Sequence, residues 1–408
     1  MQTRWPIAII CLNLVIDAMG VGLILPVLPF LLEDILGSDV SEAALWGGVL
    51  LVVYAVMQFL SGPLIGNLSD ALGRRPVLIG CLIALGIDYL LMAVAPTLLL
   101  LIVARAISGV AGSTMAASSA YLADISAPED RAKNFGLIGA AFGIGFVLGP
   151  LIGGLLGTFG PRAPFVAAAV LALLNAGLAF ALLPESLKPE NRRPFVWSAA
   201  NPVRALDRLA RVSDLGGYAV VYLLMGVASW VYPAVWTYYV VYVFGFSELQ
   251  VGLTLTAYGT ALFLVQGVLI RPVLARLGEW RTAVTGILLA AIGLVLLTLI
   301  GSPLVLFLFI PFLALGEVAD PALTGAMSNR VGDDVQGELQ GILASLTGLA
   351  TMVSPVLFTF VFWSFSGPGA VADMPGAPFL LAAVLCFAAL RVFLRTQRSD
   401  GRLSLPSR

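Results

Sequence analysis

Five ionisable side chains stand inside long apolar runs of the sequence: Asp17, Asp88, Arg105, Glu317 and Asp320. Such a group is costly to bury away from water unless it is paired or hydrated. Arg105 stays charged and therefore needs a partner, which we expect to be Asp17. A carboxylate beside a buried arginine ionises easily, and it can carry a proton if the arginine moves away. A fixed pair that only orients helices is the alternative.

Glu317 and Asp320 are three residues apart, so a helix would place them on one face. Two neighbouring carboxylates in a low dielectric titrate as a coupled pair, which makes them a second candidate for proton coupling. Asp320 precedes Pro321 and could instead lie near the inner surface, simply hydrated. For Asp88, an outer-gate or structural role is the alternative to proton handling.

Amide and aromatic side chains inside the apolar runs are candidates for a substrate cavity. Aromatic residues are dense between 230 and 239, where they could face a flat or cationic organic molecule. They could equally be interfacial anchors, since Trp and Tyr collect at helix ends. The amides could instead bond neighbouring helices. The predicted cavity residues are Asn13, Gln58, Trp230, Tyr232, Trp236 and Gln266.

The composition requires lipid as the solvent. The chain is 60% hydrophobic and 11% charged, against about 25% charged in soluble domains. The absence of histidine and the apolar settings of Cys11, Cys81 and Cys386 give no metal or disulfide spacing. We find no catalytic constellation, phosphate-binding loop or nucleic-acid stripe. The sequence therefore predicts an all-α membrane protein that is not an enzyme and needs no metal or cofactor.

Twelve apolar runs are long enough to be membrane helices. The chain divides into an N-terminal six-helix bundle (1–185), a cytoplasmic linker (186–214), a C-terminal six-helix bundle (215–396) and a cytoplasmic tail (397–408). The predicted helices cover 6–31, 43–65, 76–95, 97–122, 135–158, 164–184, 216–244, 250–272, 283–300, 303–326, 338–364 and 377–394.

The distribution of basic residues predicts the orientation. With both termini in the cytoplasm, the loops on the inner side hold all but two of the 22 lysines and arginines. Arg162 falls outside, and Arg105 falls within a helix. This asymmetry follows the positive-inside rule and supports the count of twelve helices independently of hydropathy.

The strongest local motif is the loop at 66–76, with the sequence GNLSDALGRRP. Its glycines permit a tight turn, and Asp70 can meet basic groups or a helix N-terminus. The loop resembles the signature loop of the major facilitator superfamily, which implies a role in latching two halves together. A degraded echo, RLGEWR, at 276–281 fits a duplicated six-helix unit. The predicted gating residues are Gly66, Asp70, Gly73, Arg74 and Arg75.

A second motif lies in the fifth predicted helix, at 145–154. Small residues there let backbones pack closely, and the proline bends the axis. The spacing resembles the antiporter motif of drug and proton exchangers, which favours export over import. Its residues are Gly145, Gly149, Pro150, Gly153 and Gly154.

Taken along its whole length, the chain resembles the tetracycline-efflux branch of the drug:proton antiporters. The matching stretches are 16–29, 87–89, 120–125 and 334–341. The resemblance implies export of a drug, taken in tetracycline pumps as a metal chelate, in exchange for a proton. By that resemblance Asp17, Asp88 and Arg105 take important polar roles, and Asp70 takes the gating role.

The sequence departs from that branch in its second half. Tetracycline pumps usually carry a histidine in helix 8, where this chain has Leu262, and an aspartate in helix 9, where 283–300 has no charge. Helix 10 carries Glu317 and Asp320 instead. We expect a relative whose second-half carboxylate has moved to helix 10, with a different or broader substrate range.

These observations together predict proton-driven efflux of small amphipathic drugs by alternating access, across the bacterial inner membrane. The expected partners are protons, the substrate and the lipid bilayer, with the protein acting as a single chain. A proton-coupled or passive metabolite transporter is one alternative, and a non-transporting sensor on the same scaffold is another.

Overall fold

The computed structural model describes residues 4–112, 114–127, 130–195, 215–331 and 335–399. Most of the predicted linker, from 196 to 214, and the end of the predicted tail, from 400 to 408, lie outside the described residues. Every regular element within the described residues is helical, which confirms the all-α prediction.

The chain forms two compact units. The first comprises Met1–Pro202 with Gly245–Gly259, and the second comprises Val203–Phe244 with Thr260–Arg408. The division predicted from the sequence, into bundles of residues 1–185 and 215–396, stays a prediction. The two units are described separately below.

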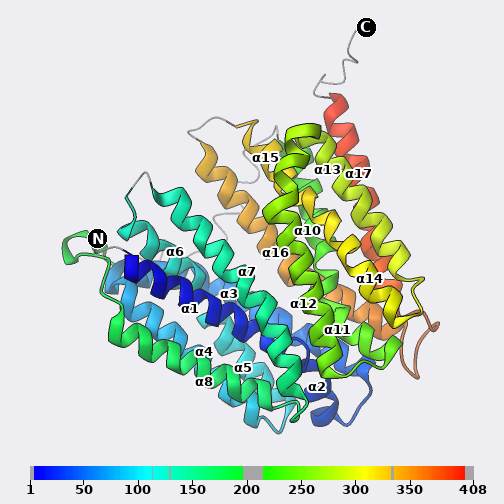
Figure 1. Ribbon diagram of the computed structural model, residues 1–408, viewed down its shortest axis with the longest axis horizontal. Coiled ribbons are helices and arrows are strands. Elements are labelled where there is room, and N and C mark those ends of the chain that lie inside the picture. Colours follow the sequence, from blue (N-terminus) through cyan, green and yellow to red (C-terminus); the bar gives the residue numbers. More distant parts are fainter. Residues whose placement is uncertain (1–3, 113, 128–129, 196–214, 332–334, 400–408) are drawn as a thin grey trace. The chain divides into compact units, whose positions relative to one another are not determined.

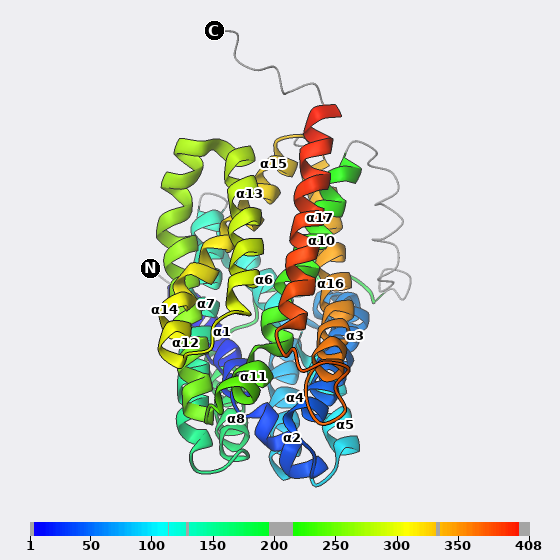
Figure 2. The same ribbon diagram turned by 90° about the vertical axis from the view of Figure 1, so that its right-hand side faces the viewer.

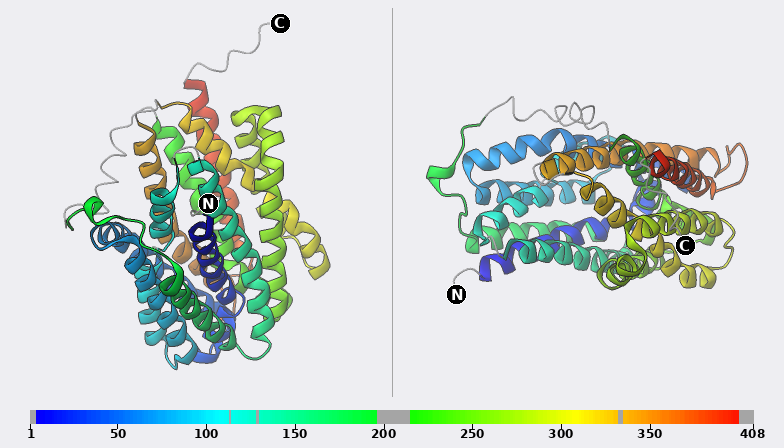
Figure 3. Two further views of the ribbon diagram at one scale, coloured as in Figure 1. Left: turned by 60° about the vertical axis from the view of Figure 1, so that its left-hand side comes forward. Right: turned by 90° about the horizontal axis from the view of Figure 1, so that it is seen from above.

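In the first unit, helices distant in sequence pack closely. α1 and α7 run side by side (Figure 1), and α4 packs along α8 (Figure 3). The helices of this unit are α1 (Arg4–Ile24), α2 (Leu28–Leu36), α3 (Val40–Leu72), α4 (Arg74–Val94), α5 (Leu98–Ala111), α6 (Thr114–Ile125), α7 (Arg131–Gly157), α8 (Ala163–Leu182) and the short 3-10 helix η2 (Pro189–Asn191).

In the second unit, α10 packs against both α16 and α17 (Figure 2). α12 begins in the first unit and ends in the second. The elements from α10 onward are α10 (Gly216–Ser229), α11 (Val231–Phe244), α12 (Glu248–Leu264), the π-helix η5 (Val265–Leu269), α13 (Ile270–Leu297), α14 (Pro303–Ala314), the 3-10 helix η6 (Leu315–Val318), α15 (Ala319–Ser328), α16 (Gln336–Ser364) and α17 (Ala377–Ser399).

Ten of the described helical segments are long and apolar enough to cross a membrane, and the shorter apolar helix Leu98–Ala111 adds to them. One of the ten, Glu248–Leu297, contains two predicted helices. They are separated where Gly278 takes a φ of +70°, a conformation that favours glycine. The two parts of this segment, the nine other long segments and the shorter helix match the twelve predicted helices in order.

Local signals explain several helix ends. α1 ends at Ile24 and not at the predicted residue 31, because Pro26 supplies no N–H and disfavours helix in the residue before it. Gly37 closes α2 with a φ of +63°. Asp39 then starts α3, since its side chain accepts the backbone N–H of Glu42 at 3.0 Å.

Candidate functional site

A buried ion pair joins α4 to α5 in the first unit. Arg105 donates from Nη2 to Oδ2 of Asp88 at 2.5 Å, and the Asp88 side chain is 0% exposed. The Arg105 guanidinium also lies 6.0 Å from the ring centroid of Tyr54. Our prediction that Asp17 is the partner of Arg105 is therefore wrong. α4 and α5 are neighbours in the chain and pack together, so Asp88 meets Arg105 first.

Asp17, on α1, has a different partner. Its Oδ2 accepts a hydrogen bond from the hydroxyl of Thr114, the first residue of α6, at 2.5 Å. Asp17 is half-buried, and Thr114 closely follows Gly112, which Gln58 joins to Tyr54 beside Arg105. The first unit thus collects two carboxylates and one guanidinium in one polar cluster.

Two of the predicted cavity amides also lie in the first unit. Gln58 donates from Nε2 to the hydroxyl of Tyr54 at 3.2 Å and to the carbonyl of Gly112 at 3.0 Å. It therefore bonds α3 to the end of α5. Asn13 is buried, and its side-chain amide has no hydrogen-bond partner among the described residues.

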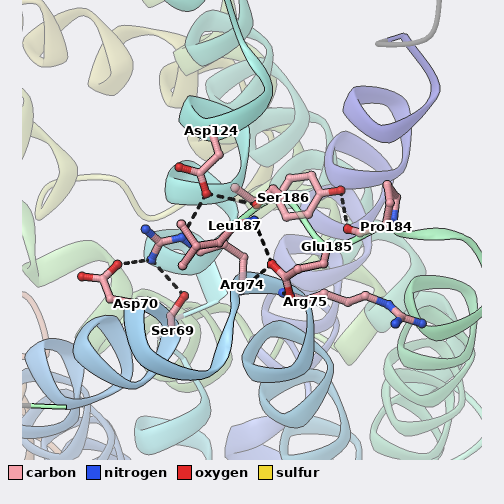
Figure 4. Close-up of polar contacts among 10 residues, drawn as sticks. Ser69, Asp70, Arg74, Arg75, Asp124, Pro184, Glu185, Ser186 and Leu187 are labelled. Atoms are coloured by element: carbon pink, nitrogen blue, oxygen red, sulfur yellow. Dashed lines mark hydrogen bonds and ion pairs between the residues drawn. The ribbon is translucent and has the colours of Figure 1, made fainter. Parts of the chain in front are cut away.

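The predicted gating loop at 66–76 is mostly helical, because α3 continues to Leu72 and α4 begins at Arg74, which leaves only Gly73 as the turn between them (Figure 4). Gly73 takes a φ of +112°, which only glycine adopts without strain. Arg74 bridges two carboxylates, with 2.6 Å to Asp70 and 3.2 Å to Asp124. Arg75 points away, donating to the carbonyl of Phe180 at 2.5 Å.

The remaining loop glycine does not bring helices together. A Cβ added at Gly66 would meet nothing within 4 Å, so the tight turn depends on Gly73. Two acidic residues at the loop were missing from our predicted site. Asp124 ends α6, and Glu185 follows α8. Spacing in the sequence could not reveal them, because they lie 50 and 111 residues from Arg74.

The echo of this loop in the second unit keeps the turn but changes the charge. Gly278 has a positive φ, as Gly73 does. The next residue is Glu279 where the first unit has Arg74. Its Oε1 accepts a hydrogen bond from Asn329 at 2.6 Å, just past the end of α15.

Glu317 and Asp320 line one cavity in the second unit. The predicted continuous helix is broken here, with Glu317 in the 3-10 turn η6 and Asp320 in the first turn of α15. The cavity has a volume of about 250 Å³. It lies among α10, α16 and the η6–α15 break. Its lining is Tyr222, Met225, Gly226, Ser229, Trp230, Gly316, Glu317, Ala319, Asp320, Leu346, Thr347 and Ala350.

Of the predicted cavity residues, Trp230 lines this space, at the break between α10 and α11. Tyr232 instead packs against Trp236 and Phe379, with ring centroids 6.2 and 6.3 Å away. Trp236 is only 4% exposed, which makes it a core residue. Gln266 is exposed within the π-helix η5.

The glycines of the antiporter motif face two different neighbours. A Cβ at Gly145 or Gly153 would collide with the α1 backbone, and one at Gly149 would lie 2.8 Å from the Cα of Gly22. Gly154 faces the start of α12, where a Cβ would lie 2.6 Å from the carbonyl oxygen of Glu248. The motif therefore sets how closely α7 approaches both helices.

We predict that Gly149→Ala destabilises the folded protein by about 1–3 kcal/mol, because the added methyl group overpacks the α1–α7 contact. Gly143→Ala is the matched control, since a Cβ at Gly143 meets nothing within 4 Å. Thermal unfolding in detergent measures the difference. Equal melting temperatures for the two variants would contradict the packing role.

Among the described residues, no group of three or more acidic, cysteine or histidine side chains could hold a metal ion.

Comparison with known proteins gives a consistent result. A family model described as Major Facilitator Superfamily matches residues 10–215 and 218–407. The chain is 40% identical to the class C tetracycline resistance protein of Escherichia coli, over 96% of this chain and 98% of the relative. It is 34% identical to the class H protein of Pasteurella multocida, over 93% of each.

Solved structures agree on the fold. The human organic anion transporter MFSD10 has a TM-score of 0.70 at 26% identity, covering 96% of this chain and 100% of that one. The nucleoside transporter NupG has a TM-score of 0.78 at 15% identity, covering 97% and 99%. The chain belongs to the major facilitator superfamily, in its group of tetracycline resistance proteins, and it is a multi-pass membrane transporter and not an enzyme.

Proposed function

We propose that this transporter exports small amphipathic drugs across the bacterial inner membrane in exchange for protons, by alternating access and without a cofactor. The names of its relatives support drug export, and the α7 glycine motif supports antiport. The observation that carries the proposal is the buried charge cluster of Asp17, Asp88 and Arg105. Groups of this kind at membrane depth mark proton relays and substrate pathways.

The cluster holds one carboxylate more than it can neutralise. Asp88 is paired with Arg105, whereas Asp17 accepts a hydrogen bond from the neutral Thr114 hydroxyl. An unneutralised carboxylate in a low dielectric is stabilised by a bound proton. Asp17 is therefore the proposed proton carrier, and Asp88 keeps Arg105 charged and in place. The test is whether an imposed pH gradient drives drug accumulation in proteoliposomes.

The cavity of the second unit is the proposed contact for the drug. It combines the rings of Tyr222 and Trp230 with the carboxylates of Glu317 and Asp320, and its lining among the described residues includes no basic side chain. Aromatic faces and carboxylates both attract organic cations. Either carboxylate could also take up a proton when the drug leaves.

We predict that Glu317→Gln raises the KM for a cationic aromatic drug by about tenfold, the loss of about 1.4 kcal/mol of binding. The KM for a neutral substrate should change little, because only the charge interaction is removed. Initial rates with a panel of lipophilic cations and tetracycline–magnesium would measure this. Glu338→Gln is the control, since Glu338 is outside the cavity lining. Equal changes in the KM for charged and neutral compounds would contradict recognition of the drug's charge by Glu317.

The remaining proposals concern topology. Both termini lie in the cytoplasm, as the distribution of basic residues predicts, and the protein works as a monomer. Reporter fusions at each terminus test the first statement. Transport by protein reconstituted at less than one chain per vesicle tests the second.

A further inference from the structure

A segment that follows α8 lies across the turn between α3 and α4. It comprises residues 184–193 and contains the 3-10 helix η2. Its first residue accepts a hydrogen bond, from the hydroxyl of Tyr121 to the carbonyl of Pro184 at 2.7 Å. Its last donates one, from the backbone N–H of Arg193 to the carbonyl of Asp70 at 3.1 Å. Both ends of the segment are thus hydrogen-bonded to other parts of the first unit.

Glu185 uses both carboxylate oxygens within this contact (Figure 4). Oε1 accepts the backbone N–H groups of Arg74 at 2.9 Å and Leu187 at 3.0 Å. Oε2 accepts the N–H of Arg75 at 3.2 Å. Arg74 and Arg75 open α4, where backbone N–H groups have no partner within the helix and the helix dipole favours an anion.

The turn itself supplies no such acceptor. The residue before α4 is Gly73, which has no side chain to cap the helix. A Cβ at that position would collide with Oε2 of Glu185. The cap therefore comes from a residue 111 positions away, and the absence of a side chain at Gly73 gives it room.

The residues held by this segment are the ones that bridge the loop. Glu185 fixes the backbone of Arg74, whose guanidinium reaches Asp70 and Asp124. The neighbouring Ser186 donates its hydroxyl to the same Oδ2 of Asp124 at 3.0 Å. Two adjacent residues thus hold both partners of the Arg74–Asp124 ion pair.

We propose that Glu185 is a positioning residue for transport, which holds Arg74 where it bridges Asp70 and Asp124. This inference rests on the proposed transport function. Glu185 contacts neither the charge cluster nor the drug cavity in the described contacts, so it acts on the rate of the conformational cycle. Drug affinity is set elsewhere.

The test compares Glu185→Gln with Glu190→Gln in the full chain. Glutamine keeps the size of the side chain but turns one acceptor oxygen into a donor that faces an N–H group. Glu190 is exposed in the same segment and serves as the control. Hydrogen exchange at the amides of Arg74, Arg75 and Leu187 reports on the cap directly, and drug transport in proteoliposomes gives KM and the maximal rate separately.

For Glu185→Gln we expect amide exchange at these positions to rise about tenfold, since a hydrogen bond to a charged group is lost. The maximal transport rate should fall about tenfold with the KM unchanged within about twofold. Glu190→Gln should change neither quantity. Unchanged exchange, or a loss that appears only in the KM, would overturn the inference.

Should Glu185→Gln fail to fold, Ser186→Ala provides the second variant. It keeps the cap and removes only the Ser186 hydrogen bond to Asp124, which stays paired with Arg74. It should therefore lower the maximal rate less and leave the KM unchanged, and an unaltered rate would overturn the inference. Wild-type protein that moves no drug would contradict the proposed function instead. The exchange measurement would then still decide whether Glu185 holds the turn.

Discussion

Replacing Arg105 with glutamine is expected to destabilise the folded protein by about 3–5 kcal/mol, because Asp88 is left buried without its countercharge. The cost arises from desolvation of the carboxylate, which is fully shielded from solvent. Asp88 can take up a proton to limit the cost, so destabilisation should be greatest at alkaline pH. Thermal unfolding can be followed with a thiol-reactive dye, since Cys81 and Cys386 are buried in the folded protein.

The double variant Asp88→Asn/Arg105→Gln should recover most of the lost stability, because two neutral amides replace the pair. Asp34→Asn is the control: it removes the 3.4 Å ion pair with Arg162, in which both side chains are exposed. Such a surface pair contributes about 1 kcal/mol or less. Wild-type stability in the single Arg105→Gln variant would contradict a tightly paired, buried Asp88.

Asp17→Asn is expected to abolish gradient-driven drug accumulation while leaving drug–drug exchange intact. A pH gradient of two units supplies about 2.7 kcal/mol per proton, enough for about hundredfold accumulation in one-for-one exchange. Asparagine cannot carry the proton, so the variant should reach no accumulation. It can still accept the hydrogen bond of Thr114, so the fold should survive.

Accumulation of a labelled drug under a fixed gradient, and exchange with no gradient, are the two measurements. Thr114→Val should give an intermediate level, because it removes the hydroxyl that donates to Asp17 and leaves the carboxyl group. Normal accumulation by Asp17→Asn would show that Asp17 is not the proton carrier. The Asp88–Arg105 pair or the cavity carboxylates Glu317 and Asp320 would then be the candidates.

The sequence was sufficient for the fold because apolar runs and basic loops are local signals. Long hydrophobic stretches marked the helices, and Gly73 and Gly278 marked the two turns. The breaks after Ala111, at Trp230 and at 315–318 were not predicted. Each break nevertheless has a local cause: Gly112 follows Ala111, and Pro233 and Pro321 lack the N–H that would bond the carbonyls of Ser229 and Glu317.

The pairing of the charged side chains was harder to predict than the identity of the residues in the site. The sequence identified Asp17, Asp88 and Arg105, but the pairing depends on how each helix is rotated about its axis. Arg105 could face either α1 or α4 until the orientation of α5 is known, so the sequence could not choose between Asp17 and Asp88. Glu185 was missed for a related reason, since its carboxylate caps a helix that begins 111 residues earlier.

The most direct test of proton–drug exchange is to measure proton movement caused by a drug gradient. Proteoliposomes would contain a pH-sensitive dye, and drug would be added outside with no imposed pH gradient. The account predicts that wild-type protein moves protons out as drug enters, and that Asp17→Asn moves none. Entry of drug into wild-type vesicles without any proton movement would contradict it, and the chain would then be a passive facilitator.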